Sequence, residues 1–265
     1  MSFTERLQFE KRIIEWKDPV SGNLLRRPAA FIGGSGEFSP MPGYSRFWKP
    51  ALSAAVEEAR GSFEPKQYRE NIEIAHLFYS LEELKESFEA NQVVKIKIRS
   101  IDELRNVQKI HDCFDGKIKF RIDLNGYLDF DEAFELFNKI DNSDLNVEFI
   151  EQPLKSIDEM SELNRVVKDK GFDTALAIDE SVANMQELVF ACQKNSFDLL
   201  VLRNQHCGGV EKGIIWAQLC EQYGKTCVVS TLMETEIGVR SGIKLAKAIP
   251  NLFGACGLFP YAEAV

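Results

Sequence analysis

From residue 75 onward the sequence alternates between short apolar runs and segments with helical spacing of apolar residues, and this alternation strongly limits the possible folds. Each apolar run has the length of one buried strand. The eight runs are EIAHLFYS, VVKIKI, KIKFRIDL, VEFIEQPL, TALAIDES, DLLVLR, TCVVSTL and LFGACGL. Strands and helices in this order predict an α/β fold, here a TIM-like (β/α)7β barrel that occupies residues 75–265.

The helical segments begin with recognisable N-terminal signals. Three of them start with Ser or Asp followed three residues later by Glu, which is the pattern of a capping box. The three pairs are Ser100 with Glu103, Asp129 with Glu132, and Ser156 with Glu159. These signals support helices that begin soon after the preceding strand ends.

Residues 1–74 have a different pattern. The runs LQFEKRIIEW and LLRRPAAFI flank the turn-forming residues DPVSGN, which predicts an antiparallel pair of strands. The following GGSGEFSPMPGYS is rich in Gly, Pro and Ser and is predicted to be a loop, and residues 49–60 have helical spacing. We therefore expect a reduced α+β capping domain before the barrel.

Three acidic residues recur at the same point of the strand–helix unit. Asp123, Glu151 and Asp179 are evenly spaced along the chain, and each closes an apolar run. In a parallel barrel the carboxyl ends of all strands meet at one mouth, so these carboxylates are expected to converge. Converging hard oxygen donors predict a Mg²⁺ site, which Mn²⁺ could also fill.

Basic residues lie on the strands beside these acids. Side chains two positions apart share one face of a strand, so Lys95 and Lys97 point the same way, and Arg121 points the same way as Asp123. Charged side chains inside a barrel are seldom found unless they are paired or functional. Both lysines and Arg121 are therefore candidate functional residues.

Composition excludes several classes of function. The formal net charge of -9 argues against non-specific nucleic-acid binding, and the absence of an apolar run near 18 residues argues against a membrane span. The N-terminal MSFTERLQFEKR has no apolar core of a signal peptide, so we expect a cytoplasmic location. The six cysteines lack CxxC spacing and are predicted to be reduced core residues.

Four short motifs occur in order at successive strand ends: KIK, DLN, IEQP and DES. Together they resemble the enolase superfamily, in its muconate-cycloisomerase-like branch, over the whole barrel portion. The segment FIGGSGEFSPMPGYS is similar to the capping-domain loop that folds over the substrate in that branch. The resemblance implies abstraction of a proton next to a carboxylate, with Mg²⁺ stabilising the enediolate that results.

The resemblance also implies roles for individual residues. By position, Asp123, Glu151 and Asp179 would bind the metal, with Asn125 and Glu180 supporting them. Lys97 would be the general base, because the nearby positive charges of Lys95 and the metal disfavour its ammonium form. Lys95 would add positive potential near the substrate carboxylate.

The sequence departs from this branch at the sixth strand, where Arg203 stands in place of a second lysine. Arginine stays protonated and is a poor base, so racemisation and epimerisation, which need an acid/base on each face, are disfavoured. A syn elimination needs only one base, and Arg203 could then stabilise the enolate or stack on a ring.

This asymmetry, and the RxDxN pattern of Arg121, Asp123 and Asn125, resemble divergent bacterial members of the o-succinylbenzoate synthase family. The resemblance implies a Mg²⁺-dependent lyase that dehydrates 2-succinyl-6-hydroxy-2,4-cyclohexadiene-1-carboxylate on the route to menaquinone. Ser230 and Thr231 lie where that family holds the succinyl tail, although they could be ordinary strand-end hydroxyls. Arg121 could contact the substrate or support the metal site.

Two other readings remain open from the sequence. One is another isomerase of the superfamily, of the muconate cycloisomerase or dipeptide epimerase type, and Arg203 counts against both. The other is a barrel that binds a ligand without catalysis. His206 follows the sixth strand at the mouth, where we expect a loop role. The partner is expected to be a small carboxylate substrate, and the chain is expected to be a monomer or a small homo-oligomer.

Overall fold

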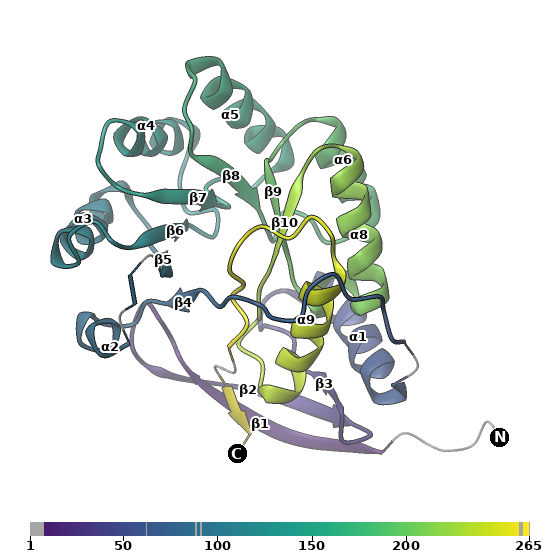
Figure 1. Cartoon of the computed structure of the whole chain (residues 1–265). Helices are drawn as coiled ribbons and strands as arrows, with labels where there is room; N and C mark the ends of the chain where they lie inside the picture. The colour runs from purple at the N-terminus through teal and green to yellow at the C-terminus, as the bar shows by residue number, and fades with distance from the viewer. Residues whose placement is uncertain (1–7, 62, 88, 91, 260–261, 265) are drawn as a thin grey trace.

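The computed structural model describes residues 8–61, 63–87, 89–90, 92–259 and 262–264. These residues form a seven-stranded parallel sheet and a four-stranded antiparallel sheet, which Figure 1 shows with helices around the parallel strands. Residues 1–7, which begin the segment expected to lack a signal peptide, lie outside the described residues. No helix in the described part of the chain is both long enough and apolar enough to cross a bilayer.

The parallel sheet is built in the order of the chain, so that each strand pairs with the strands before and after it. Its strands are β4 (His76–Leu77), β5 (Val93–Lys97), β6 (Lys119–Asp123), β7 (Val147–Glu151), β8 (Ala175–Ile178), β9 (Leu199–Leu202) and β10 (Thr226–Val229). Because every pair is parallel and joined through a helix, all carboxyl ends lie at one edge of the curled sheet.

Helices follow the strands and cover the outer face of this sheet (Figure 1). They are α2 (Leu81–Glu86), α3 (Leu104–Cys113), α4 (Phe130–Asp141), α5 (Ile157–Lys170), α6 (Met185–Gln193), α7 (Asn204–Cys207), α8 (Val210–Gln222) and α9 (Glu236–Ala248). Capping boxes form at Asp129 and Ser156, as predicted. The box predicted at Ser100 does not form, because a 3-10 turn, η2 (Ile101–Glu103), separates this serine from α3.

The main core lies between the strands and the outer helices. Ile122 and Ile150 are fully buried in one apolar cluster with Leu136 of α4 and Leu163 of α5. Because side chains alternate across a strand, the residue after each isoleucine points to the opposite, inner face. All six cysteines are free; five are buried as predicted, whereas Cys113, at the end of α3, is exposed.

The segment at residues 252–258, predicted as an eighth strand, forms isolated bridges instead of a regular strand. Leu252 bridges to Cys227 in β10, and Cys256 bridges to Ile74, close to β4. Gly254 has a positive φ of 50°, which interrupts the extended backbone between these bridges. The segment therefore lies between the two edges of the parallel sheet without completing a ladder.

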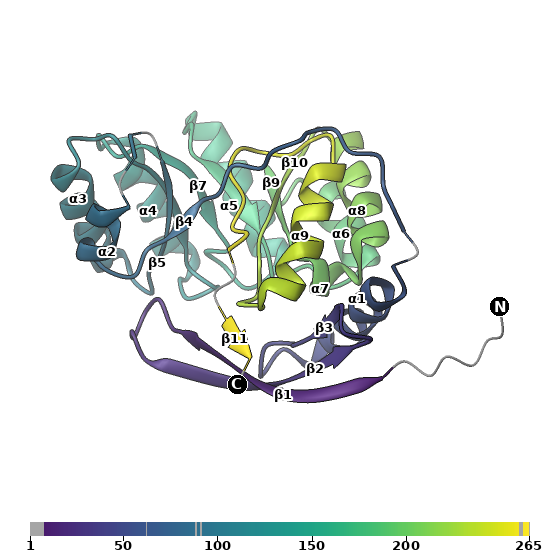
Figure 2. The same ribbon diagram turned by 60° about the horizontal axis from the view of Figure 1, so that its bottom comes forward.

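The antiparallel sheet lies beneath one end of the parallel sheet, as Figure 2 shows. It consists of β1 (Phe9–Lys17), β2 (Leu24–Ile32), β3 (Gly36–Phe38) and β11 (Ala262–Ala264), in the order β11-β1-β2-β3. The predicted antiparallel pair is β1 with β2. The region predicted as a loop contains β3, and β11 brings the end of the chain back to β1. The turn η1 (Ser45–Phe47) and helix α1 (Trp48–Arg60) complete this N-terminal module.

Two carboxylates of the N-terminal module attach it to helices of the parallel unit. Glu37 in β3 accepts hydrogen bonds from the backbone amides of Thr235 (3.1 Å) and Gly238 (3.0 Å) at the start of α9. Glu57 in α1 accepts one from the amide of Val210 (2.7 Å), the first residue of α8. Helix N-termini carry unpaired amides and a partial positive charge, so both contacts are favourable. The module is therefore fixed at the carboxyl edge of the parallel sheet.

Glu58 of α1 lies at this junction and is expected to make the stability of the folded protein depend on pH. Its carboxylate accepts hydrogen bonds from Asn204 Nδ2 (2.6 Å) and from the amide of Glu37 (3.2 Å). Burial raises the pKa of Glu58 from 4.5 to about 8, and nearby Glu234 and Glu37 act in the same direction. The unfolded chain ionises this group near pH 4.5 while the folded protein resists ionisation, so stability is lost as the pH rises from 5 to 8.

The variant Glu58→Gln should remove this loss. The difference in free energy of unfolding between the variant and wild type should shift in favour of the variant by about 1–3 kcal/mol as the pH rises from 5 to 8. The reason is that Gln keeps the shape of Glu and does not titrate. Urea denaturation at several pH values measures this difference, and Glu82→Gln on the exposed face of α2 is the control. A difference that stays constant over this pH range would contradict the assignment.

Candidate active site

The three predicted acids lie at neighbouring strand ends. Asp123 is the last residue of β6, Glu151 is the last residue of β7, and Asp179 directly follows β8. Asp123 and Glu151 are register partners in the sheet. All three side chains are buried, with at most 4% exposed. The structure thus brings the three carboxylates together at the edge where the N-terminal module is attached.

Two lysines of β5 approach these acids. Lys95 Nζ lies 2.8 Å from Asp123 Oδ2 and 2.7 Å from Glu151 Oε2, so it joins two acids. Lys97 Nζ lies 3.3 Å from Asp123 Oδ2 and donates a hydrogen bond to Asn125 Oδ1 at 3.0 Å. The side chain of Lys97 is 24% exposed, compared with 13% for Lys95. Lys97 is therefore the more accessible and less firmly paired of the two.

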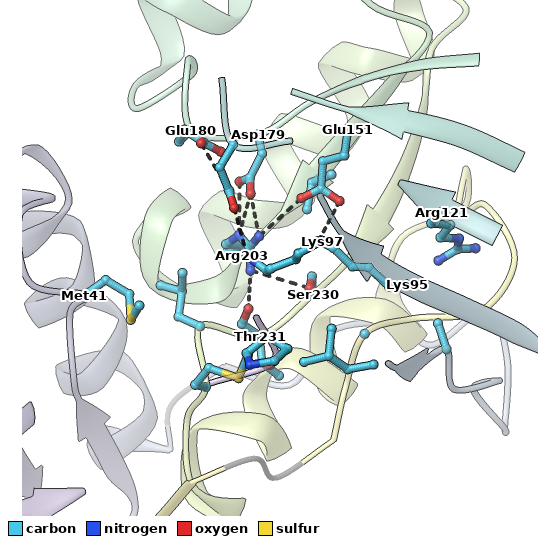
Figure 3. A pocket seen from close by; sticks show the side chains of 18 of the residues that line it. Met41, Lys95, Lys97, Arg121, Glu151, Asp179, Glu180, Arg203, Ser230 and Thr231 are labelled. Atoms are coloured by element: carbon cyan, nitrogen blue, oxygen red, sulfur yellow. Dashed lines mark hydrogen bonds and ion pairs between the residues drawn. The ribbon is translucent and has the colours of Figure 1, made fainter. Parts of the chain in front are cut away.

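Arg203 follows β9 and enters the same cluster from the other side (Figure 3). Its Nε lies 3.0 Å from each carboxylate oxygen of Asp179, and its Nη2 also contacts Asp179. The same Nη2 lies 3.4 Å from Glu151 Oε1, while Nη1 donates to the carbonyl oxygen of Thr231. The guanidinium is thus directed at two of the three acids.

The charges in this cluster shift one another's pKa. Burial opposes ionisation of Asp123, but the ammonium groups of Lys95 and Lys97 hold its pKa well below the usual range. Burial raises the pKa of Glu151 to about 7, and the negative charge of Asp123 adds to this effect. Burial would lower the pKa of Lys95, but Asp123 and Glu151 raise it, so Lys95 stays an ammonium ion.

Asn125 and Glu180 lie next to the acids, as predicted. The amide of Asn125 donates to Asp123 Oδ1 at 3.2 Å, and its Nδ2 donates to Glu180 Oε1 at 3.3 Å. Burial, together with the charge of Asp179, raises the pKa of Glu180 to about 8. Asn125 therefore connects Lys97, the acid of β6 and Glu180.

Gln152 has a structural role that the sequence did not reveal. It is fully buried, with a positive φ of 45°, and its Oε1 accepts a hydrogen bond from the amide of Asp179 at 2.8 Å. Its Nε2 donates to the carbonyl of Leu154 and to Ser181 Oγ, both at 2.6 Å. Gln152 thus positions the backbone that carries Asp179. The only signal was an amide between a strand-end acid and a proline.

A cavity of about 220 Å³ opens beside the charged cluster. Both structural units line it. Lys95, Lys97 and Arg203 contribute from the parallel sheet. The N-terminal module contributes Trp16, Asp18, Pro19, Leu25, Met41 and Tyr44. A ligand in this cavity would be enclosed between the charged strand ends and a largely apolar cover.

The other predicted residues also line the cavity, in different ways. Arg121 donates to Glu148 Oε2 (2.8 Å) and to the carbonyl of Ala255 (2.6 Å), and it points away from Glu151 and Asp179 (Figure 3). Its Nη2 is buried and has no hydrogen-bond partner among the residues described. Ser230 and Thr231 border the cavity beyond β10. His206, expected in a loop, lies in α7 and stacks on the ring of Phe47 in the N-terminal module.

The donor chemistry at this site fits a divalent metal ion, although the present contacts are with cations of the protein. Within the described ranges, no group of three or more His, Cys, Asp or Glu side chains is arranged to hold a metal ion. The carboxylates of the three acids instead contact Lys95 and Arg203. Three buried hard-oxygen donors on adjacent strand ends nevertheless match the preference of Mg²⁺ or Mn²⁺.

Comparison with known families decides the class of this site. The family model described as Enolase C-terminal domain-like matches residues 80–262, which contain both lysines, the three acids and Arg203. The chain belongs to this family. The expected membership of the enolase superfamily is thus confirmed. The Enolase C-terminal domain-like region covers the parallel sheet from α2 onward.

Curated relatives of this enolase-superfamily chain include two kinds of enzyme. The o-succinylbenzoate synthase of Thermobifida fusca (strain YX) is 29% identical over 253 residues, which cover 90% of this chain and 74% of the relative. The L-Ala-D/L-Glu epimerase of Bacillus subtilis (strain 168) is 27% identical over 172 residues, which cover 64% of this chain and 45% of the relative.

Solved structures of the superfamily share the fold. The substrate-liganded L-Ala-D/L-Glu epimerase from Bacillus subtilis has a TM-score of 0.78 at 19% identity, covering 96% of this chain and 89% of that chain. The muconate lactonizing enzyme from Pseudomonas putida has a TM-score of 0.77 at 14% identity, covering 96% and 87%. The arrangement of a parallel sheet with an N-terminal antiparallel sheet is therefore a fold that this chain shares with both solved structures.

Proposed function

We propose that this protein is an o-succinylbenzoate synthase, a Mg²⁺-dependent lyase that dehydrates 2-succinyl-6-hydroxy-2,4-cyclohexadiene-1-carboxylate. The observation that carries the proposal is the asymmetry of the site. Lys97 is a partly exposed amine with a single carboxylate contact, whereas Arg203 is held by Asp179, Glu151 and Thr231 and cannot act as a base. A reaction that needs one base fits this site better than one that needs two.

Lys97 is the base in this proposal, and Lys95 is not. Lys95 is paired with two buried acids that raise its pKa, so it stays protonated at neutral pH. Its fixed charge would stabilise the substrate carboxylate. Lys97 Nζ would take the proton from the carbon that bears the carboxylate and would then give that proton to the leaving hydroxyl on the same face. Water leaves, the ring becomes aromatic, and Lys97 returns to its starting state.

Asp123, Glu151 and Asp179 would hold the metal ion. When bound, Mg²⁺ would supply Lewis-acid stabilisation for the negative charge that develops on the substrate carboxylate. Asn125 would keep Asp123 and Lys97 in their relative positions through its two hydrogen bonds. Arg203 would contribute positive charge on the face opposite Lys97.

Arg121, Ser230 and Thr231 are proposed to bind the succinyl tail. Arg121 lines the cavity and its buried Nη2 lacks a hydrogen-bond partner among the described residues, so a carboxylate that reached this atom would satisfy it. The N-terminal module would act as a capping domain, residues 1–74, over a barrel domain, residues 75–265. Trp16, Met41 and other apolar side chains of its cavity face would exclude water from the ring.

Two activity assays separate this function from epimerisation. The purified chain with Mg²⁺ should convert authentic substrate to the aromatic product, followed by absorbance, and EDTA should remove the activity. The same preparation should not convert L-Ala-L-Glu to L-Ala-D-Glu, because Arg203 offers no second base that could act on the opposite face. No product above the buffer rate, or rapid epimerisation of the dipeptide, would overturn the proposal.

A further inference from the structure

Arg203 is hydrogen-bonded directly to Asp179, one of the proposed metal ligands. Its Nε donates to Asp179 Oδ1 and Oδ2, both at 3.0 Å, and its Nη2 contacts Oδ2 as well. Both oxygens of this carboxylate therefore face the guanidinium. The Arg203 side chain is 8% exposed, and the Asp179 side chain is 3% exposed. The pair is thus shielded from solvent, where charge-assisted hydrogen bonds are strong.

The same guanidinium is anchored at two further points. Nη2 lies 3.4 Å from Glu151 Oε1, and Nη1 contacts the carbonyl oxygen of Thr231 and lies 3.5 Å from Ser230 Oγ. Lys95 occupies the other side of the cluster, between Asp123 and Glu151. Each of the three acids therefore already has a cationic partner from the protein. A divalent ion that uses these oxygens would compete with these cations for them.

We propose that Arg203 is a positioning residue that competes with the divalent metal for Asp179 and Glu151, so that metal binding requires its guanidinium to turn toward the cavity. This proposal rests on the metal ligands named in the proposed function. Arg203 itself lines the cavity, so it has space to turn into. Its planar fork fits a carboxylate with two parallel hydrogen bonds, which the point charge of a lysine cannot do. The structure thus predicts a metal affinity that Arg203 weakens.

Arg203→Lys tests this competition without a change in net charge. The long-range electrostatic attraction between the site and the metal stays the same. Only the planar guanidinium, which donates several hydrogen bonds to Asp179, is lost. The Kd for Mn²⁺ alone, measured by isothermal titration or by the EPR signal of free Mn²⁺, should fall at least about tenfold. Arg121→Lys is the matched control, because Arg121 is also buried but pairs with Glu148, and it should keep the wild-type Kd.

Further measurements make each outcome decisive. If Arg203→Lys does not fold, judged by circular dichroism, Arg203→Met replaces it and should bind Mn²⁺ at least about tenfold more tightly than Arg121→Met, which removes the same charge from the same cavity. An unchanged or weaker affinity in the folded variant would overturn the proposal, and so would an absence of Mn²⁺ binding in all variants. The affinity is independent of turnover. If the wild-type protein has no dehydratase activity but Arg203→Lys still binds Mn²⁺ more tightly than wild type, this inference holds and the proposed function is refuted.

Discussion

Lys97→Ala is expected to lower the turnover of 2-succinyl-6-hydroxy-2,4-cyclohexadiene-1-carboxylate by about 10³-fold or more, while the protein stays folded and still binds metal. General bases typically contribute about 10²–10⁴-fold, and here the same amine also returns the proton to the leaving group. Lys95 cannot replace it, because two buried acids hold Lys95 as an ammonium ion. The rate of product formation under saturating Mg²⁺ measures the effect.

A lysine outside the cavity supplies the control for this variant. Lys119 is at the start of β6, 41% exposed, and 3.8 Å from Glu148. Lys119→Ala should keep a rate within about twofold of wild type. Thermal melting of both variants checks that the fold survives. A residual rate of Lys97→Ala within about tenfold of wild type, which is about 1.4 kcal/mol in the barrier, would rule Lys97 out as the base.

Glu151→Gln is expected to weaken Mn²⁺ binding by about 100-fold or more, equivalent to about 2.7 kcal/mol, and to abolish turnover. Glu151 is the middle one of the three acids in the sheet, so the change removes both a negative charge and one of the proposed metal ligands. The fold should tolerate the change, because Gln keeps the shape of Glu151 and its amide oxygen can still accept the hydrogen bond from Lys95. Titration with Mn²⁺, and thermal melting with and without metal, measure both effects.

The matched control for Glu151→Gln lies on the same strand. Glu148 of β7 pairs with Arg121 and lies outside the acidic cluster. Glu148→Gln should therefore leave the Kd for Mn²⁺ unchanged. Equal affinities for wild type and Glu151→Gln would show that the metal, if bound at all, uses other ligands.

Local periodicity predicted the parts of the fold that depend on neighbours in sequence. The strands that end in Asp123 and Glu151 could be predicted because apolar runs and helical spacing are local patterns. The position of Lys97 beside Asp123 followed from the two-residue period of a strand and from the order of the strands. The antiparallel pair β1–β2 followed from its turn residues in the same way.

Features set by contacts between distant segments could not be predicted. Pairing of β11 with β1 joins the two ends of the chain, and a three-residue strand has no periodic signal. The eighth strand was expected from an apolar run, but Gly254 interrupts the ladder. The sequence placed Arg203 at the strand end, yet the direction of its guanidinium depends on Asp179 and Thr231, which lie 24 and 28 residues away. Gln152 acts through a backbone amide on another strand, which no local pattern reveals.

A crystal structure of the full chain with Mg²⁺ and o-succinylbenzoate tests the central claim most directly. The account predicts Mg²⁺ bound at about 2.0–2.1 Å by oxygens of Asp123, Glu151 and Asp179. Lys97 Nζ should face the ring carbon that bears the carboxylate, with Arg203 on the opposite face. A metal held by other residues, or a product ring with no lysine on either face, would contradict the account.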